Sequence, residues 1–194
     1  MTAVIQLFMF LVWLRQGFSE SHISWLFGVP KSTVSRYLIT WSNYLYFCLR
    51  SIPIWPNKEQ VIVTMPECFR DTYPTTQCII DCTELFVQVP SSLATLSALY
   101  SFYKHHITYK GLVGIAPSEA IIFVSQLYPG SVSNKEIVQH CGILHPLLWN
   151  EGNSVMADCG FTIDKDLRPL KVHLNIPAFL ENKDQLYQEQ VIES

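Results

Sequence analysis

The chain has 194 residues, of which 49% are hydrophobic and 15% are charged. An average soluble chain carries about 25% charged residues, so this composition excludes a disordered segment. The longest apolar run, Leu7 to Leu14, is too short for a transmembrane helix, which needs about 20 residues. The run also lacks the basic flank and the small-residue cleavage site of a signal peptide. We therefore expect no membrane partner.

The formal net charge of −3 is divided unevenly along the chain. Residues 1–58 carry five basic side chains and one acidic side chain, a net charge of +4. Residues 59–194 carry eight basic and fifteen acidic side chains, a net charge of −7. A basic segment on an acidic body is typical of a protein in which only the basic segment contacts a polyanion.

Three helices are expected in the first fifty residues. Residues 2–14 suit a buried helix because they are apolar almost all round. Ser19 is a good N-cap for a second, short helix, and Gly28 ends that helix. A third helix is predicted from Ser32 to about Phe47. Its apolar face carries Val34, Tyr37, Leu38, Trp41 and Leu45.

The second and third helices, joined by a short turn that contains glycine, form the pattern of a helix-turn-helix. In that motif the N-terminal residues of the later of the two helices, here the helix predicted from Ser32, enter the major groove of DNA. Arg36 would bind guanine or phosphate, and the hydroxyl groups would bond to either. A plain helical hairpin packed on the rest of the protein fits the same pattern, so both interpretations stay open. The expected DNA-contacting residues are Lys31, Ser32, Thr33, Ser35 and Arg36.

The pattern changes to strands after a proline-containing linker, Ser51 to Pro56. Early strands joined by hairpins, followed by alternating helices and strands, predict a mixed α/β sheet. The predicted domains are a helical region over residues 1–50, a linker and connecting segment over 51–72, and an α/β domain over 73–194. We expect strands at residues 77–80, 85–89, 112–115, 120–127, 154–157 and 172–176, and helices at 133–148, 164–170 and 185–194.

Two aspartates follow apolar segments of the predicted sheet. Asp81 follows Cys78–Ile80, and Asp158 follows Val155–Ala157. A carboxylate at the end of an apolar strand costs free energy unless it is paired, hydrogen-bonded or bound to a cation. If the two strands are neighbours, both carboxylates meet at one edge of the sheet, an arrangement that suits Mg²⁺. The alternative, which stays open, is that each aspartate caps a following turn or helix.

Five segments resemble, in order, the motifs of the DDE transposases of the Harbinger-like superfamily: Ile79–Glu84, Pro90–Ser92, Tyr103–His106, Gly130–Ser133 and Met156–Phe161. The stretch Phe27–Arg36 also resembles the helix-turn-helix that precedes the nuclease domain in such proteins. The resemblance implies a ribonuclease-H-like mixed sheet with flanking helices, a divalent metal cofactor (Mg²⁺ or Mn²⁺), and cleavage and joining of DNA strands. No small-molecule cofactor is implied.

The resemblance assigns catalytic and metal-binding roles to Asp81 and Asp158. The third acid of the family lies on a helix after the last strand, in a motif rich in Arg, His and Val. Only 36 residues follow Asp158, and they contain no such motif. Glu189 and Glu193 are the nearest acids, and both come too early to match. The sequence therefore predicts a domain that lacks its third acidic ligand and is truncated at its C-terminus.

Three functional hypotheses follow. The first in rank is a transposase-derived protein that binds DNA without cutting it. The alternatives are an active metal-dependent endonuclease or transposase and a truncated fragment with no independent function. A DNA-binding role implies the nucleus, although no basic localisation run is present, and a homo-oligomer is an open expectation. Lys104, His105, His106 and Lys110 form a basic patch that is expected to contact DNA phosphates, with a solvated loop as the alternative. Glu84 is expected on the strand face opposite Asp81, in a supporting role.

Overall fold

The computed structural model describes residues 1–176. The chain forms two compact units that divide between Pro53 and Ile54. None of the helices in the described residues is long and apolar enough to cross a membrane. The helix expected at residues 185–194, with Glu189 and Glu193, lies outside the described residues.

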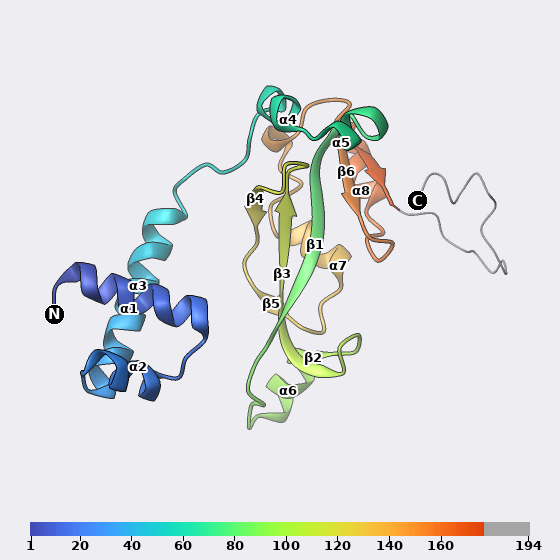
Figure 1. Ribbon diagram of the computed structural model, residues 1–194. Coiled ribbons are helices and arrows are strands. Elements are labelled where there is room, and N and C mark those ends of the chain that lie inside the picture. Colours follow the sequence, from blue (N-terminus) through green and yellow to red (C-terminus); the bar gives the residue numbers. More distant parts are fainter. Residues whose placement is uncertain (177–194) are drawn as a thin grey trace. The chain divides into compact units, whose positions relative to one another are not determined.

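The first unit consists of three helices around a small apolar core (Figure 1). They are α1 (Ala3–Gln16), α2 (Glu20–Phe27) and α3 (Lys31–Leu49). Leu38 and Val34 face the core from α3, while Arg36 on the other side of the helix is exposed. The amphipathic pattern predicted for this helix is therefore confirmed. The buried core residues are Met9, Phe10, Ile23, Val34 and Leu38.

The turns between these helices form where the sequence predicts them. The Ser19 hydroxyl accepts a hydrogen bond from the backbone N–H of His22 at 3.3 Å and so caps α2. Gly28 ends the same helix with a φ of 63°, in the left-handed region that glycine adopts without a steric penalty. Pro30 then stands directly before Lys31, the first residue of α3. The result is two helices joined by a tight turn.

The second unit is built on a mixed sheet with the strand order β2-β3-β1-β6-β7, in which β4 and β5 also pair with β3. The central strand β1 pairs antiparallel with β3 and parallel with β6, and β6 pairs parallel with β7. This mixed α/β sheet is the predicted fold class. The strands are β1 (Thr76–Phe86), β2 (Tyr100–Ser101), β3 (His106–Ile115), β4 (Ile121–Val124), β5 (Tyr128–Pro129), β6 (Ser154–Ala157) and β7 (His173–Asn175).

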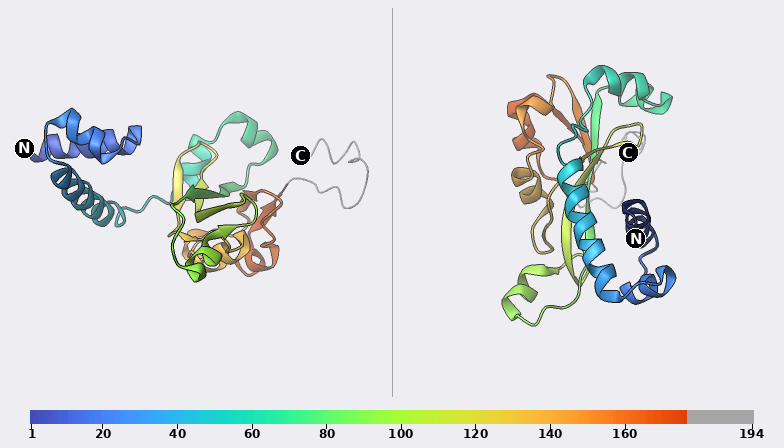
Figure 2. Two further views of the ribbon diagram at one scale, coloured as in Figure 1. Left: turned by 90° about the horizontal axis from the view of Figure 1, so that it is seen from below. Right: turned by 90° about the vertical axis from the view of Figure 1, so that its left-hand side faces the viewer.

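The main core of this unit lies on one side of the sheet, where α7 (Asn134–His140) and α8 (Asp164–Leu167) are found (Figure 2). Cys78 and Ile80 of β1 point into it, because side chains two residues apart share one face of a strand. The other short helices of the unit are α4 (Lys58–Thr64), α5 (Glu67–Thr72), α6 (Leu93–Leu99) and the 3₁₀ turns η1 (Pro146–Leu148) and η2 (Arg168–Leu170).

Several predicted elements have other bounds in the structure; the strand expected at residues 112–115, for example, begins at His106. The helix expected at residues 133–148 ends at His140, because Gly142 has a φ of 87° and Pro146 begins a separate 3₁₀ turn. The two strands expected at residues 77–80 and 85–89 are one continuous strand, β1. The polar residues between those two segments pair with β3 along their whole length, so no break occurs there.

Gly130, in one of the family-like motifs, fills a position that has no room for a side chain. A Cβ atom there would lie 2.6 Å from the carbonyl oxygen of Leu99 and 2.8 Å from that of Thr108. The Gly130 N–H also donates to the Thr108 carbonyl oxygen at 2.9 Å. The segment that leads to Ser133 and α7 is thus held directly against β3 by backbone contact.

Candidate functional site

Asp81 and Asp158 stand at the same level of two neighbouring strands. The parallel pairing of β1 with β6 runs up to the pair Ile80–Ala157, and each aspartate is the next residue. Ile80 and Ala157 are buried in the core, whereas both aspartates are exposed. Since successive strand residues alternate between faces, Asp81 lies on the side of the sheet opposite that core.

The two aspartates make the same local hydrogen bond. Oδ1 of Asp81 accepts from the backbone N–H of Cys82 at 2.7 Å, and Oδ1 of Asp158 accepts from that of Cys159, also at 2.7 Å. Within residues 1–176, the second oxygen of each carboxylate has no hydrogen bond or ion pair. Two exposed carboxylates with free oxygens at one level of the sheet fit a divalent cation such as Mg²⁺, which binds oxygen ligands and retains water.

The backbone around the two aspartates differs. Asp158 directly follows β6, and its backbone carbonyl accepts from the Phe161 N–H at 3.0 Å, so a turn begins there. Asp81 does not end a strand, contrary to the prediction, because β1 continues to Phe86. Asp158 therefore precedes a turn, whereas Asp81 lies inside a paired strand.

The thiols beside the aspartates are in their neutral form at neutral pH. Burial, and after it the charge of Asp81, raises the pKa of Cys82 to about 12. The Cys159 thiol donates to Asp158 Oδ1 at 3.2 Å, and this hydrogen bond raises the pKa of Cys159. All six cysteines are free thiols. The charge at this site therefore comes from the two carboxylates.

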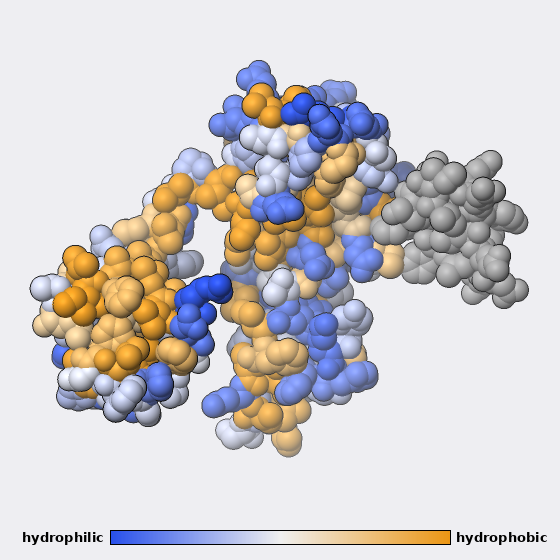
Figure 3. Space-filling view, in the orientation of Figure 1, coloured by the Kyte–Doolittle hydropathy of each residue, from blue (hydrophilic) through white to orange (hydrophobic). Residues whose placement is uncertain are grey.

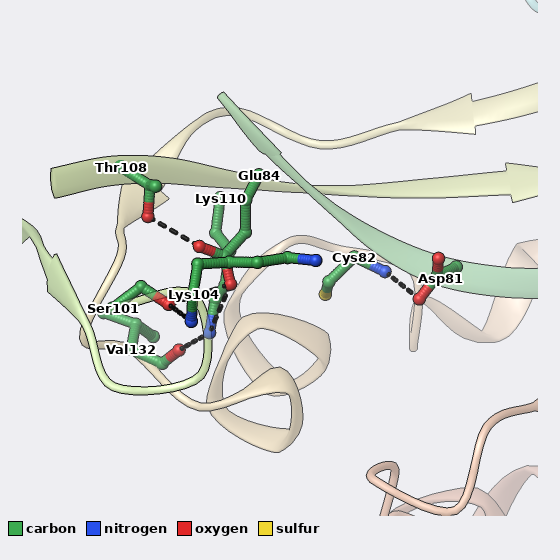
Figure 4. Close-up of polar contacts among 8 residues, drawn as sticks. All are labelled: Asp81, Cys82, Glu84, Ser101, Lys104, Thr108, Lys110 and Val132. Atoms are coloured by element: carbon green, nitrogen blue, oxygen red, sulfur yellow. Dashed lines mark hydrogen bonds and ion pairs between the residues drawn. The ribbon is translucent and has the colours of Figure 1, made fainter. Parts of the chain in front are cut away.

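Glu84 takes part in a buried polar network on the opposite face of the sheet (Figure 4). Its carboxylate accepts from the Ser101 hydroxyl at 3.0 Å and from the Thr108 hydroxyl at 2.7 Å, and it lies 3.7 Å from Lys110 Nζ. The side chains of Glu84 and Lys110 are only 5% and 11% exposed. Lys110 Nζ also donates to the Val132 carbonyl at 3.1 Å. The network thus ties β1, β2 and β3 to the segment before α7.

The prediction that Lys110 contacts DNA phosphates is wrong, because its side chain is buried beside Glu84. It points into the core and neutralises Glu84, so it cannot reach a phosphate. Its direct cross-strand pairing with Glu84 is the signal that could have identified this role, once the register of β1 and β3 is known. The other three residues of that patch, Lys104, His105 and His106, are exposed at the end of the β2–β3 hairpin.

The residues predicted to contact DNA in the helix-turn-helix all belong to the first two turns of α3. Lys31, Ser32 and Arg36 are exposed, and Thr33 and Ser35 are half-buried. The Arg36 guanidinium lies 5.8 Å from the centroid of the Tyr37 ring. No acidic side chain occurs between Glu20 and Lys58, so the surface of α3 carries positive charge only.

Comparison with known protein families gives two matches. Residues 80–194 match the family described as DDE superfamily endonuclease. Residues 2–51 match the family described as helix-turn-helix of DDE superfamily endonuclease. Neither the curated proteins nor the solved structures searched contain a match to the chain.

The buried pair makes Lys110 a stability determinant. We expect Lys110→Met to lower the free energy of unfolding by about 3–5 kcal/mol, because it leaves the Glu84 carboxylate buried without a cation. The double variant Glu84→Gln/Lys110→Met removes both charges and is expected to lower the free energy of unfolding by less than the single variant does. Urea unfolding followed by circular dichroism measures the free energy of unfolding of both variants, with the exposed Lys165→Met as the matched control. A single variant as stable as that control would contradict the role of the pair.

Proposed function

The chain belongs to the DDE superfamily of endonucleases, and we propose that it binds DNA through α2 and α3 and holds a divalent metal ion, Mg²⁺ or Mn²⁺, on Asp81 and Asp158. Members of this superfamily are generally dependent on divalent metal. The observation that carries the proposal is the parallel register of β1 and β6, in which Asp81 and Asp158 both follow the pair Ile80–Ala157. The bound metal would polarise a phosphate oxygen and activate water.

The DNA-binding part of the proposal assigns recognition to the start of α3. Lys31, Ser32, Thr33, Ser35 and Arg36 would contact base edges or phosphates in the major groove. Lys104, His105 and His106 would contact phosphates from the second unit. We also assign the chain to the Harbinger-like group on the motifs given above, and its DNA-binding role to the nucleus.

Arg36 is the residue whose loss is expected to affect duplex binding most. Arg36→Ala should weaken binding to duplex DNA and reduce the slope of log affinity against log salt by about one unit, because one phosphate contact is lost. Fluorescence anisotropy over a salt series measures both quantities. Arg50→Ala is the matched control. Arg50 directly follows the C-terminal end of α3, and its guanidinium lies 5.9 Å from the centroid of the Tyr46 ring, much as Arg36 lies over Tyr37. Equal affinity and slope in the two variants would show that α3 is only structural.

The catalytic part of the proposal is that the 194-residue chain binds DNA without cutting it. Within residues 1–176, no group of three His, Cys, Asp or Glu side chains is arranged to hold a metal ion. A two-metal displacement needs ligands for both ions, and losing one element of charge stabilisation typically costs about 10²–10³ in rate. An active endonuclease completed by another acid, such as Glu189 or Glu193, is the second candidate function.

A cleavage assay on supercoiled plasmid separates these two functions. We expect no nicking by the chain in Mg²⁺ or Mn²⁺ beyond that seen with its Asp81→Asn variant. Metal-dependent nicking that the substitution abolishes would overturn the proposal of inactivity and would show that the site is complete. Nicking that persists in the variant would come from a contaminating nuclease, which is removed before the comparison is repeated.

A further inference from the structure

The β2–β3 hairpin ends in a loop of exposed aromatic and basic side chains. We call residues 101–106 the hairpin tip. Phe102 is 77% exposed and Tyr103 is 80% exposed. Next to them, Lys104, His105 and His106 are exposed as well. The Phe102 ring meets the Tyr100 ring edge to face, with the centroids 5.3 Å apart. Two large and mostly exposed aromatic side chains in succession are typical of a binding surface.

The charge around the hairpin tip favours a polyanion. Although residues 59–194 carry a net charge of −7, no acidic residue occurs between Glu84 and Glu119. Glu84 itself is buried and paired with Lys110. The exposed basic side chains of the tip are therefore one lysine and two histidines, with no acidic side chain beside them in the sequence. Hydrophobic residues also gather at this end of the sheet, where β2 and α6 lie (Figure 3).

The hairpin tip is held in place by the polar network beneath it. The Ser101 hydroxyl donates to Glu84 and accepts from the backbone N–H of Lys104 at 3.2 Å. Lys104 Nζ lies 4.9 Å from the centroid of the Tyr103 ring and covers one of its faces. With the ring 80% exposed, its other face is open to solvent. A pre-ordered aromatic platform of this kind loses little entropy on binding.

We propose that the hairpin tip binds unpaired DNA bases, with Phe102 and Tyr103 stacking on them and Lys104 contacting the adjacent phosphate. This inference rests on the DNA-binding function proposed above. Paired bases inside a duplex offer no face for stacking, whereas aromatic rings beside basic residues are the usual platform for single-stranded nucleic acid. The partner is thus a DNA end or junction with unpaired nucleotides.

The position of the tip sets its distance from the aspartates. Val113 pairs with Asp81, and His106 lies seven residues earlier on β3. At about 3.4 Å per residue this separation is about 24 Å along the strand. Bases stacked on the tip would therefore belong to a part of the DNA well away from a phosphate held beside Asp81 and Asp158.

The test compares the full chain on two DNA probes by fluorescence anisotropy. One is a blunt duplex, and the other is the same duplex opened into single-stranded arms of about ten nucleotides. We expect Phe102→Ala/Tyr103→Ala to lower affinity for the forked probe by about tenfold or more and to leave affinity for the blunt duplex unchanged. Phe102→Trp/Tyr103→Trp should retain fork binding, because tryptophan also stacks. Leu147→Ala, at a side chain 89% exposed elsewhere in the unit, is the matched control.

Fork affinity that the alanine pair leaves at the wild-type value would overturn the proposal. So would a change in sedimentation of the alanine pair without a change in fork affinity, since the tip would then be a self-association surface. Failure of the helix-turn-helix function is distinguishable, because it removes duplex binding in every variant, while the fork with 2-aminopurine in its arms still reports stacking on the tip. The fluorescence change of 2-aminopurine is expected in the wild type and absent in the alanine pair.

Discussion

The parallel pairing of β1 with β6 is the constraint on which the candidate site depends. Two segments far apart in the sequence, one before and one after the helix α7, are brought to one level by the register that pairs Ile80 with Ala157. The buried partners of this pairing fix the backbone. Asp81, the next residue of β1, then points to the exposed face, and Asp158, which follows the end of β6, is exposed as well. Because the register is set by core packing, a shift of one residue would place Asp81 in the core, where an unpaired carboxylate is costly.

The two faces of β1 carry different chemistry. Asp81 is exposed and has a free carboxylate oxygen, whereas Glu84, three residues later, is buried and takes three partners. Alternation along a strand explains the separation, since side chains an odd number of positions apart point to opposite faces. The buried face supplies the rigid support, through Lys110 and Ser101, and the exposed face supplies the carboxylate proposed to bind metal.

Local signals in the sequence predicted much of this fold. The N-cap at Ser19, the glycine at Gly28 and the apolar face of α3 each depend on neighbouring residues only, so the three helices could be identified. The end of α7 was missed although Gly142 carries the same local signal as Gly28, because the apolar helical periodicity continues beyond it. The partners of Glu84 depend on the pairing of β3 with both β1 and β2, which a single sequence does not reveal.

Titration of the chain with Mn²⁺, followed by electron paramagnetic resonance of the free ion, tests the shared metal site most directly. We expect Asp81→Asn and Asp158→Asn each to weaken binding of one ion by more than about tenfold, and the double variant to bind no more weakly than either alone. Asp164→Asn, which alters an exposed carboxylate paired with Arg168, should bind the ion as the wild type does. Wild-type affinity in either of the first two variants would contradict a site shared by the two aspartates.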